Sequence, residues 1–163
     1  MLIKTMFKLL LVALAVWLWM TPVYALDYPP PPSYSNALLQ GQDFSGQQLR
    51  TAEFSNANLE STNFSGADIR GAIFSGSTAT DTNFKGADLT DAMLDFAVFT
   101  RADFRDAVLV ETLWLQSSFD QVDITGADFS DAILDGVQVK MLCAIASGTN
   151  SKTGTATRDS LGC

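Results

Sequence analysis

The chain has 163 residues, enough for one domain with a sizeable core, and its 18 acidic side chains outnumber its 10 basic ones. The net charge of −8 disfavours nucleic acid and anionic lipid as partners, and a hydrophobic content of 47% is too high for a disordered chain. The sequence contains no histidine, which removes the commonest general base and the commonest zinc ligand.

Residues 1–25 have the order of a secretory signal peptide. Lys4 and Lys8 form a short basic region, and an apolar run from Leu9 to Met20 follows it. We predict cleavage after Ala25, a small residue of the kind that signal peptidase reads. The alternative is an uncleaved membrane anchor, but a span needs about 20 apolar residues and this run is shorter. Cleavage leaves 8 basic and 18 acidic side chains, a net charge of −10, on a chain that meets the membrane only through its signal segment.

Residues 26–38 form a predicted proline-rich linker. Four consecutive prolines, Pro29 to Pro32, favour an extended polyproline II segment and cannot enter a helix or a central strand. We interpret this segment as a spacer between the targeting segment and the folded body. The alternative is a proline motif that a partner binds.

From residue 39 to residue 139, every fifth residue is bulky and apolar except Ala79. In a helix, five residues advance by about 500°, so residues at this spacing wander around the axis and form no stripe. In a strand, an odd spacing sends successive members of the series to opposite faces. A solenoid that turns a corner every five residues keeps all of them inside, and its stacked coils bury a continuous core. We therefore predict a solenoid over residues 39–139.

A longer repeat gives the number of five-residue units per coil. The tripeptide Gly-Ala-Asp occurs at 66–68, 86–88 and 126–128, at spacings of 20 and 40 residues. Four units per coil produce these spacings. The position two residues before each bulky residue is mostly Ala, Ser or Thr, which predicts a second inward position that must be small.

Three segments, Ala57–Ser61, Ala67–Gly71 and Ala87–Asp91, resemble the A(D/N)LXX unit of pentapeptide repeat proteins. This resemblance extends through the repeat segment without a change of phase. It implies an all-β solenoid, a right-handed quadrilateral β-helix of about five coils with four units in each. Within this pattern, Ala79 predicts either a void in the core or a local bulge.

The pattern stops after residue 139, and we predict that residues 140–163 form a C-terminal cap. A solenoid needs such a cap because its last coil otherwise exposes its core and an unpaired strand edge. The segment Lys140–Ala146 has helical character, and Thr157 is a candidate N-cap for a final helical turn.

Cys143 and Cys163 both lie in this predicted cap. An even pair of cysteines in an exported chain favours a disulfide over two free thiols. The tail is also similar to the cysteine-bracketed ends of pentapeptide repeat proteins of the thylakoid lumen. This resemblance implies a helical, disulfide-closed cap and a location in a cyanobacterial or plastid thylakoid lumen or in a bacterial periplasm.

Outward residues twenty positions apart are expected to stack on the surface, and two such columns are mostly polar. They contain Asp43, Asn63, Asn83, Asp103 and Asp123, and Gln48, Asp68, Asp88, Val108 and Asp128. Stacked carboxylates repel one another unless they hold a cation such as calcium, whereas Asp and Asn commonly satisfy turn backbone. We predict the turn role and no metal site. Paired carboxylates also suit acid–base chemistry, but neither a histidine nor a nucleophile accompanies them, so we predict no enzyme activity and no cofactor.

A third column is mostly apolar. It contains Glu53, Ile73, Met93, Leu113 and Ile133, and Phe96 and Leu115 are expected to point outward on the same side. Contiguous exposed apolar surface often marks a contact site. We predict that a protein partner, or a second copy of the chain, binds an exposed patch of Ile73, Met93, Phe96, Leu113, Leu115 and Ile133. The alternatives are β-propensity on a solvated sheet, or cover by the tail or the linker.

Together these features predict a non-enzymatic, exported structural or interaction protein that presents β-helix faces to a partner. Two other functions remain open. Some pentapeptide repeat proteins mimic DNA and act on gyrase, which the acidic surface here loosely fits, although export argues against it because gyrase is cytoplasmic. Reduction of the cysteine pair, if it loosened the cap, would instead make this a redox-controlled protein.

Overall fold

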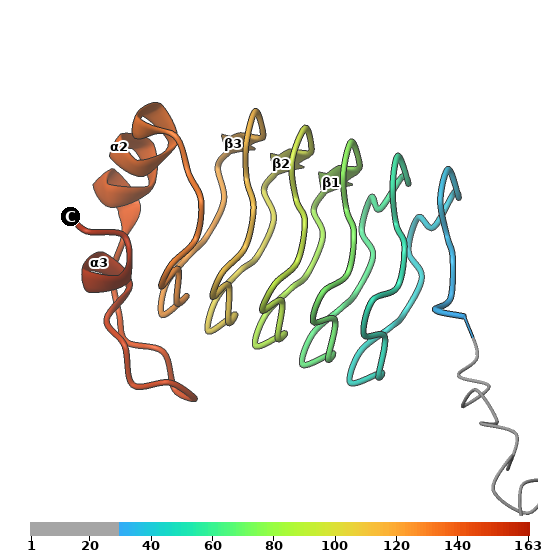
Figure 1. Cartoon of the computed structure of the whole chain (residues 1–163), viewed down its shortest axis with the longest axis horizontal. Helices are drawn as coiled ribbons and strands as arrows, with labels where there is room; N and C mark the ends of the chain where they lie inside the picture. Colours follow the sequence, from blue (N-terminus) through green and yellow to red (C-terminus); the bar gives the residue numbers. More distant parts are fainter. Residues whose placement is uncertain (1–29) are drawn as a thin grey trace, which may run out of the picture. The chain divides into compact units, whose positions relative to one another are not determined.

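The computed structural model describes residues 30–163, so the predicted signal peptide at 1–25 lies outside the described part. From Ser33 onward the backbone winds into stacked, four-sided coils (Figure 1). Residues twenty positions apart pair in parallel, as Ser33 does with Glu53 and as Leu113 does with Ile133. This is the register that the twenty-residue repeat predicts.

The first coil begins inside the segment predicted as a linker. The carbonyl of Pro32 accepts the N–H of Glu53, and the ring of Tyr34 stacks on Phe54 with 5.0 Å between the centroids. Proline lacks only a donor, so its carbonyl can still join a ladder at the open edge of a first coil. Tyr34 lies five residues before Leu39 and so belongs to the repeat. The prolines before it led to the prediction of a linker in its place.

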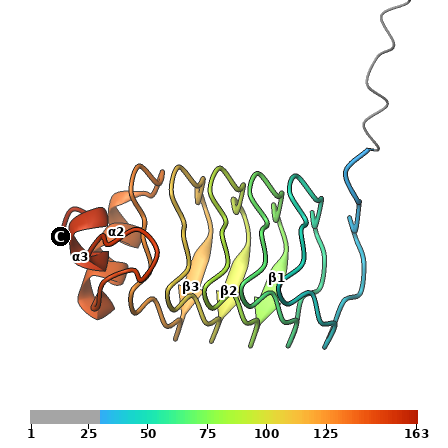
Figure 2. The ribbon, with the colours of Figure 1, turned by 90° about the horizontal axis from the view of Figure 1, so that it is seen from below.

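One side of the coils forms a regular three-stranded parallel sheet in the order β1–β2–β3 (Figure 2). The strands are β1 (Thr78–Thr80), β2 (Val98–Thr100) and β3 (Ser118–Asp120). Ala79 lies opposite Phe99 in β2 without any break in register, so of the two alternatives for Ala79 the bulge is wrong.

The inward residues form the core, and two columns of it are aromatic. The rings of Phe44, Phe64, Phe84 and Phe104 stack at centroid separations of 5.2, 5.3 and 5.0 Å. A second stack of Tyr34, Phe54 and Phe74 meets the first edge-to-face. Edge-to-face and offset-stacked rings attract beyond the area that they bury, so the aromatic columns stabilise the coil-on-coil packing.

The second inward position is small because it lies at the corner of a narrow core, and several of its residues also donate hydrogen bonds. The hydroxyls of Thr62 and Thr82 each donate to the carbonyl of the residue 23 positions earlier, at 2.8 Å. Ser117 makes the equivalent bond to Leu94. These three hydroxyls therefore bond to buried backbone carbonyls as well as fitting the space, whereas the hydroxyl of Ser77 at the same position has no hydrogen-bond partner in the described part of the chain.

Helix α2 (Gly136–Ile145) covers the last coil and begins earlier than the predicted boundary at residue 140. Asp135 is its N-cap, and the side chains of Asp135 and Gln138 form a reciprocal capping box. This capping signal, Asp-x-x-Gln, ends the repeat before Val139 can enter the core. Helix α3 (Thr157–Ser160) follows, and its N-cap is Ala156, so the prediction of Thr157 as N-cap is wrong.

Two buried amides attach the cap to the last coils. The Nδ2 of Asn150 donates to the carbonyls of Ala107 and Gly126, and Gln138 donates in the same way to two carbonyls beneath α2. The carbonyls of Gly126 and Ser117 accept no backbone N–H from residues 30–163, so these bonds satisfy two carbonyls that the last coils otherwise leave unpaired. They also add a second donor to the carbonyls of Ala107 and Trp114. Cys143 in α2 forms a disulfide with Cys163, which ties the helix to the end of the chain. Within residues 30–163, no helix has both the length and the apolar character needed to cross a membrane.

Candidate functional site

Four apolar side chains form a continuous ladder on the outside of the coils. Parallel bridges join Ile73, Met93, Leu113 and Ile133 in that order, with Glu53 before them. Their chain neighbours on both sides are buried in most coils, and alternate residues of an extended segment point to opposite faces, so these four point outward. Met93 and Ile133 are 46% and 55% exposed, and Ile73 and Leu113 are half-buried. We call these four residues the apolar ladder.

Phe96 and Leu115 lie at the corner that follows the ladder. The N–H of Phe96 donates to the carbonyl of Leu115 at 3.0 Å, and both side chains are exposed. Phe96 has a φ of 56°, in the left-handed region that bulky residues rarely adopt. Among residues 30–163, Phe96 is the only apolar residue other than glycine that has a positive φ.

Sequence reasoning missed Val98, which opens β2 beside this corner and is 43% exposed. In the outward series Leu38, Asn58, Thr78, Val98 and Ser118, it is the one apolar residue apart from Leu38 at the start of the coils. Comparison at intervals of twenty would have found it, because that comparison found the ladder.

An acidic stripe borders the other side of the ladder. Asp91, Glu111 and Asp131 stand at the corner just before Met93, Leu113 and Ile133, and all three carboxylates are exposed. The pKa of Glu111 is raised because its carboxyl group hydrogen-bonds with that of Asp91, and because Asp91 and Asp131 carry like charge. We call Asp91, Glu111 and Asp131 the acidic stripe.

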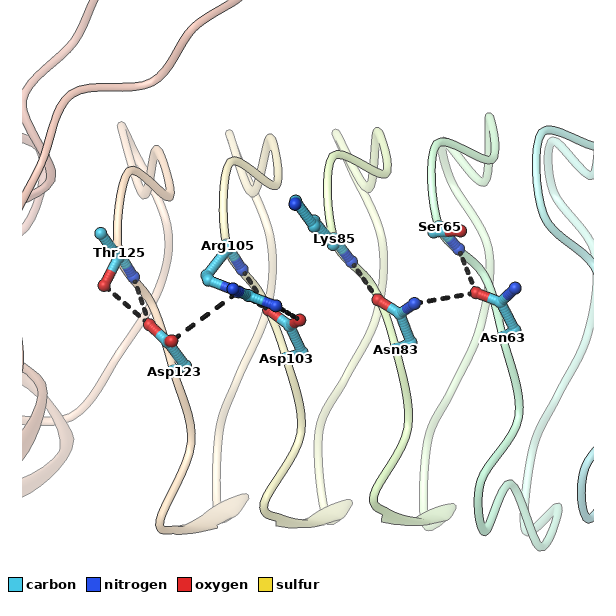
Figure 3. A network of polar contacts seen from close by, with 8 residues as sticks. All are labelled: Asn63, Ser65, Asn83, Lys85, Asp103, Arg105, Asp123 and Thr125. Atoms are coloured by element: carbon cyan, nitrogen blue, oxygen red, sulfur yellow. Dashed lines mark hydrogen bonds and ion pairs between the residues drawn. The ribbon is translucent and has the colours of Figure 1, made fainter.

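One polar column hydrogen-bonds to the backbone of the turns (Figure 3). It contains Asn63, Asn83, Asp103 and Asp123. Each side-chain oxygen accepts the N–H of the residue two positions on, at 3.0–3.1 Å. The Nδ2 of Asn83 also donates to Asn63 in the preceding coil. These contacts are the ones that the turn interpretation predicts.

Arginines separate the stacked carboxylates of the two polar columns. The Nε of Arg105 lies 2.9 Å from Asp103 and 3.7 Å from Asp123 (Figure 3), and Arg70 bridges Asp68 and Asp88 in the same way. Burial alone would raise the pKa of Asp103, but hydrogen bonds from Arg105 outweigh burial and lower it. In residues 30–163 no group of three or more acidic or cysteine side chains is arranged to hold a metal ion.

A shallow hollow of about 200 Å³ lies where α2 meets the last coils. Its lining includes Phe119, Val122, Met141 and Ile145, and it is mostly apolar. Apart from Asp120, its lining carries no ionisable side chain, so it offers no acid–base pair for chemistry.

Comparison with known proteins identifies the repeat. The family model described as pentapeptide repeats matches residues 35–76, 67–106 and 97–136. Proteins of this family form right-handed quadrilateral β-helices and are generally non-catalytic structural proteins. A crystal structure of a pentapeptide repeat protein from the Arabidopsis thaliana thylakoid lumen is similar, with a TM-score of 0.76 and 40% identity over 77% of this chain and 87% of that one.

Two curated relatives come from the same compartment. The chloroplastic thylakoid lumenal protein TL20.3 of Arabidopsis thaliana is 60% identical over 40 residues, which are 24% of this chain and 14% of that protein. The chloroplastic thylakoid lumenal 15 kDa protein 1 of the same plant is 51% identical over 47 residues, 29% of this chain and 21% of that protein. The matches thus span less than a quarter of either relative. These homologues support an exported, lumenal location, and the chain belongs to the pentapeptide repeat family, in its thylakoid-lumen type.

Proposed function

We propose that this protein is a non-enzymatic, exported interaction protein whose β-helix of about five coils presents one face to a protein partner or to a second copy. The binding surface consists of Ile73, Met93, Phe96, Leu113, Leu115 and Ile133, and Val98 extends it. The observation that carries the proposal is the exposed apolar ladder itself. The cap bonds to the last coils but leaves the ladder uncovered, with Met93 and Ile133 46% and 55% exposed.

The exposed ring of Phe96 adds a second reason. A left-handed φ in a residue other than glycine costs about 1 kcal/mol or more, and here it holds an aromatic ring 59% exposed to solvent. The φ itself belongs to the coil corner, because every fifth residue from Asn36 to Asp131 has a positive φ. Folding stability gains nothing from an exposed aromatic ring at such a corner, and the ring is explained when it is an anchor that a partner covers, since aromatic residues are enriched at the centres of interfaces.

The ion pairs on the surface count against the DNA-mimic alternative. A mimic of B-DNA needs free negative charge along its faces, but Arg70 and Arg105 each bridge two stacked carboxylates of the polar columns, so in residues 30–163 the stacked carboxylates without an ion pair are confined to the three-residue acidic stripe. The lumenal location of the relatives also separates this chain from a cytoplasmic gyrase.

The proposal predicts that Met93→Asp with Leu113→Asp weakens association with the native partner, or self-association, at least about tenfold, because desolvating a carboxylate in an apolar interface costs more than about 1.4 kcal/mol. The matched control is Thr80→Asp with Thr100→Asp. These residues also lie in adjacent coils and receive the same charge change, but on a different side of the coils, in β1 and β2.

The measurement is the hydrodynamic size of the tagged protein in a gently lysed extract of its own compartment and after purification. The ladder variant is expected to run as a smaller species, and the control is expected to run with the wild type. An identical size for all three proteins in both preparations would rule out the proposed surface.

A further inference from the structure

The acidic stripe differs from the other stacked carboxylates in having no internal counter-charge. Among residues 30–163, the ion pairs include Asp68, Asp88, Asp103 and Asp123 but none of Asp91, Glu111 and Asp131. Adjacent coils place the backbones of successive members of the stripe about 4.8 Å apart. Besides the hydrogen bond with Asp91, the like charges of Asp91 and Asp131 contribute to the raised pKa of Glu111. A positively charged partner group would relieve this repulsion.

The stripe and the apolar ladder run side by side along the coil axis. Each acidic residue precedes its ladder residue by two positions, as Asp91 precedes Met93 and Glu111 precedes Leu113. Phe96 and Leu115 border the ladder on its other side. The surface is therefore two parallel rows, one negative and one apolar, with one residue of each in every coil.

A partner strand cannot join this face through its backbone. The N–H of Met93 already donates to Ala72, and its carbonyl accepts from Phe74, while Leu113 is satisfied in the same way. The face therefore offers only side chains to a partner. The distance between successive residues along each row indicates which secondary structure of the partner fits. Successive turns of an α-helix are about 5.4 Å apart, close to the 4.8 Å between coils, whereas same-face residues of a strand are about 6.6 Å apart.

We infer that the partner of this surface is a basic amphipathic α-helix that lies along the coil axis. Its apolar side packs on Met93, Leu113 and Ile133, and lysines or arginines one helix position away pair with Asp91, Glu111 and Asp131. The inference rests on the proposed function and adds the partner's chemistry to it.

A second copy of the chain fits this description poorly. The exposed stripe of its own helix α2 contains Val137, Met141 and Ile145, but α2 carries a single basic residue, Lys140. One lysine cannot pair with three carboxylates. Helix α2 of a second copy is therefore a poor match, and the surface fits a different protein with a basic helix better.

The test uses two synthetic peptides of about 14 residues, long enough to span roughly 21 Å as a helix. Both carry the same leucine stripe, and lysine in one is replaced by glutamate in the other. Fluorescence anisotropy of the labelled peptides measures their affinity for the purified protein. The lysine peptide is expected to bind at least about tenfold more tightly at low salt, and added salt is expected to shrink the difference.

The decisive variant is Asp91→Asn with Glu111→Gln and Asp131→Asn. It is expected to lose the preference for the lysine peptide while circular dichroism shows an unchanged fold. Its control removes three exposed acids elsewhere, at Glu60, Asp120 and Asp159, with the same change in net charge. The control is expected to keep the preference.

Equal binding of the two peptides to the wild type, or equal loss in the stripe variant and its control, overturns the inference. The size measurement with Met93→Asp and Leu113→Asp is separate, so the proposed function can survive a failed basic-helix inference. Conversely, a lysine preference that depends on the stripe, with no effect of the ladder variant on native association, would overturn the proposed function.

Discussion

Replacing Phe64 with alanine is expected to lower the free energy of unfolding by about 3–5 kcal/mol. The Phe64 ring is fully buried and stacks between Phe44 at 5.2 Å and Phe84 at 5.3 Å. It also meets Phe54 and Phe74 edge-to-face. Each stacked coil depends on its neighbours, and the rigid backbone ladders on four sides limit the collapse of the resulting cavity.

The matched control is Phe96→Ala, which removes the same ring from an exposed position. Urea denaturation followed by far-ultraviolet circular dichroism measures both variants. The exposed substitution is expected to change the free energy of unfolding by about 0.5 kcal/mol or less. Similar losses for both variants would mean that the aromatic columns do not carry the stability assigned to them.

Removing the disulfide by Cys143→Ser with Cys163→Ser is the second large expected effect, about 3 kcal/mol in the chain-entropy model for a loop of this length. The loss should concentrate at the C-terminal end. The disulfide holds α2 to the tail that carries Asn150, and Asn150 bonds to the last coils. Amide hydrogen exchange should therefore accelerate around Gly126 much more than around Phe64.

The same variant tests the alternative that reduction of the disulfide regulates the protein. If reduction regulates the protein, the serine variant should lose or gain partner binding at a temperature where its repeat remains folded. A serine variant with faster exchange in the cap but unchanged binding would assign the disulfide a structural role only. Uniform exchange along the whole chain would contradict the localised effect.

Sequence reasoning recovered the interior because the five-residue period reports backbone geometry directly. The inward series, the stacking at twenty residues and the turn role of Asn83 and Asp103 all follow from positions along the chain. The two ends were less accurate. The first coil was missed because proline marks a ladder edge as readily as a linker, and α2 was placed late because the capping residues Asp135 and Gln138 were overlooked.

The candidate site could be predicted only in part. The order of Ile73, Met93, Leu113 and Ile133 follows from the repeat, but their exposed fractions depend on the cap and the corners. The main feature that the sequence did not predict is the set of ion pairs that long side chains make between coils. Nothing in the spacing shows that Arg70 and Arg105 reach across coils, and that reach leaves the acidic stripe as the group of stacked carboxylates without an ion pair in residues 30–163.

Site-specific photo-crosslinking in the native compartment tests the central claim most directly. A photoreactive residue at Met93 is compared with the same residue at Thr80, which lies in the sheet on a different side of the coils. We expect the residue at Met93 to capture one predominant protein, with crosslinks that map to a basic helix, and the residue at Thr80 to capture little. Equal yields from both positions, or no capture at Met93, would contradict the assignment of function to the apolar ladder.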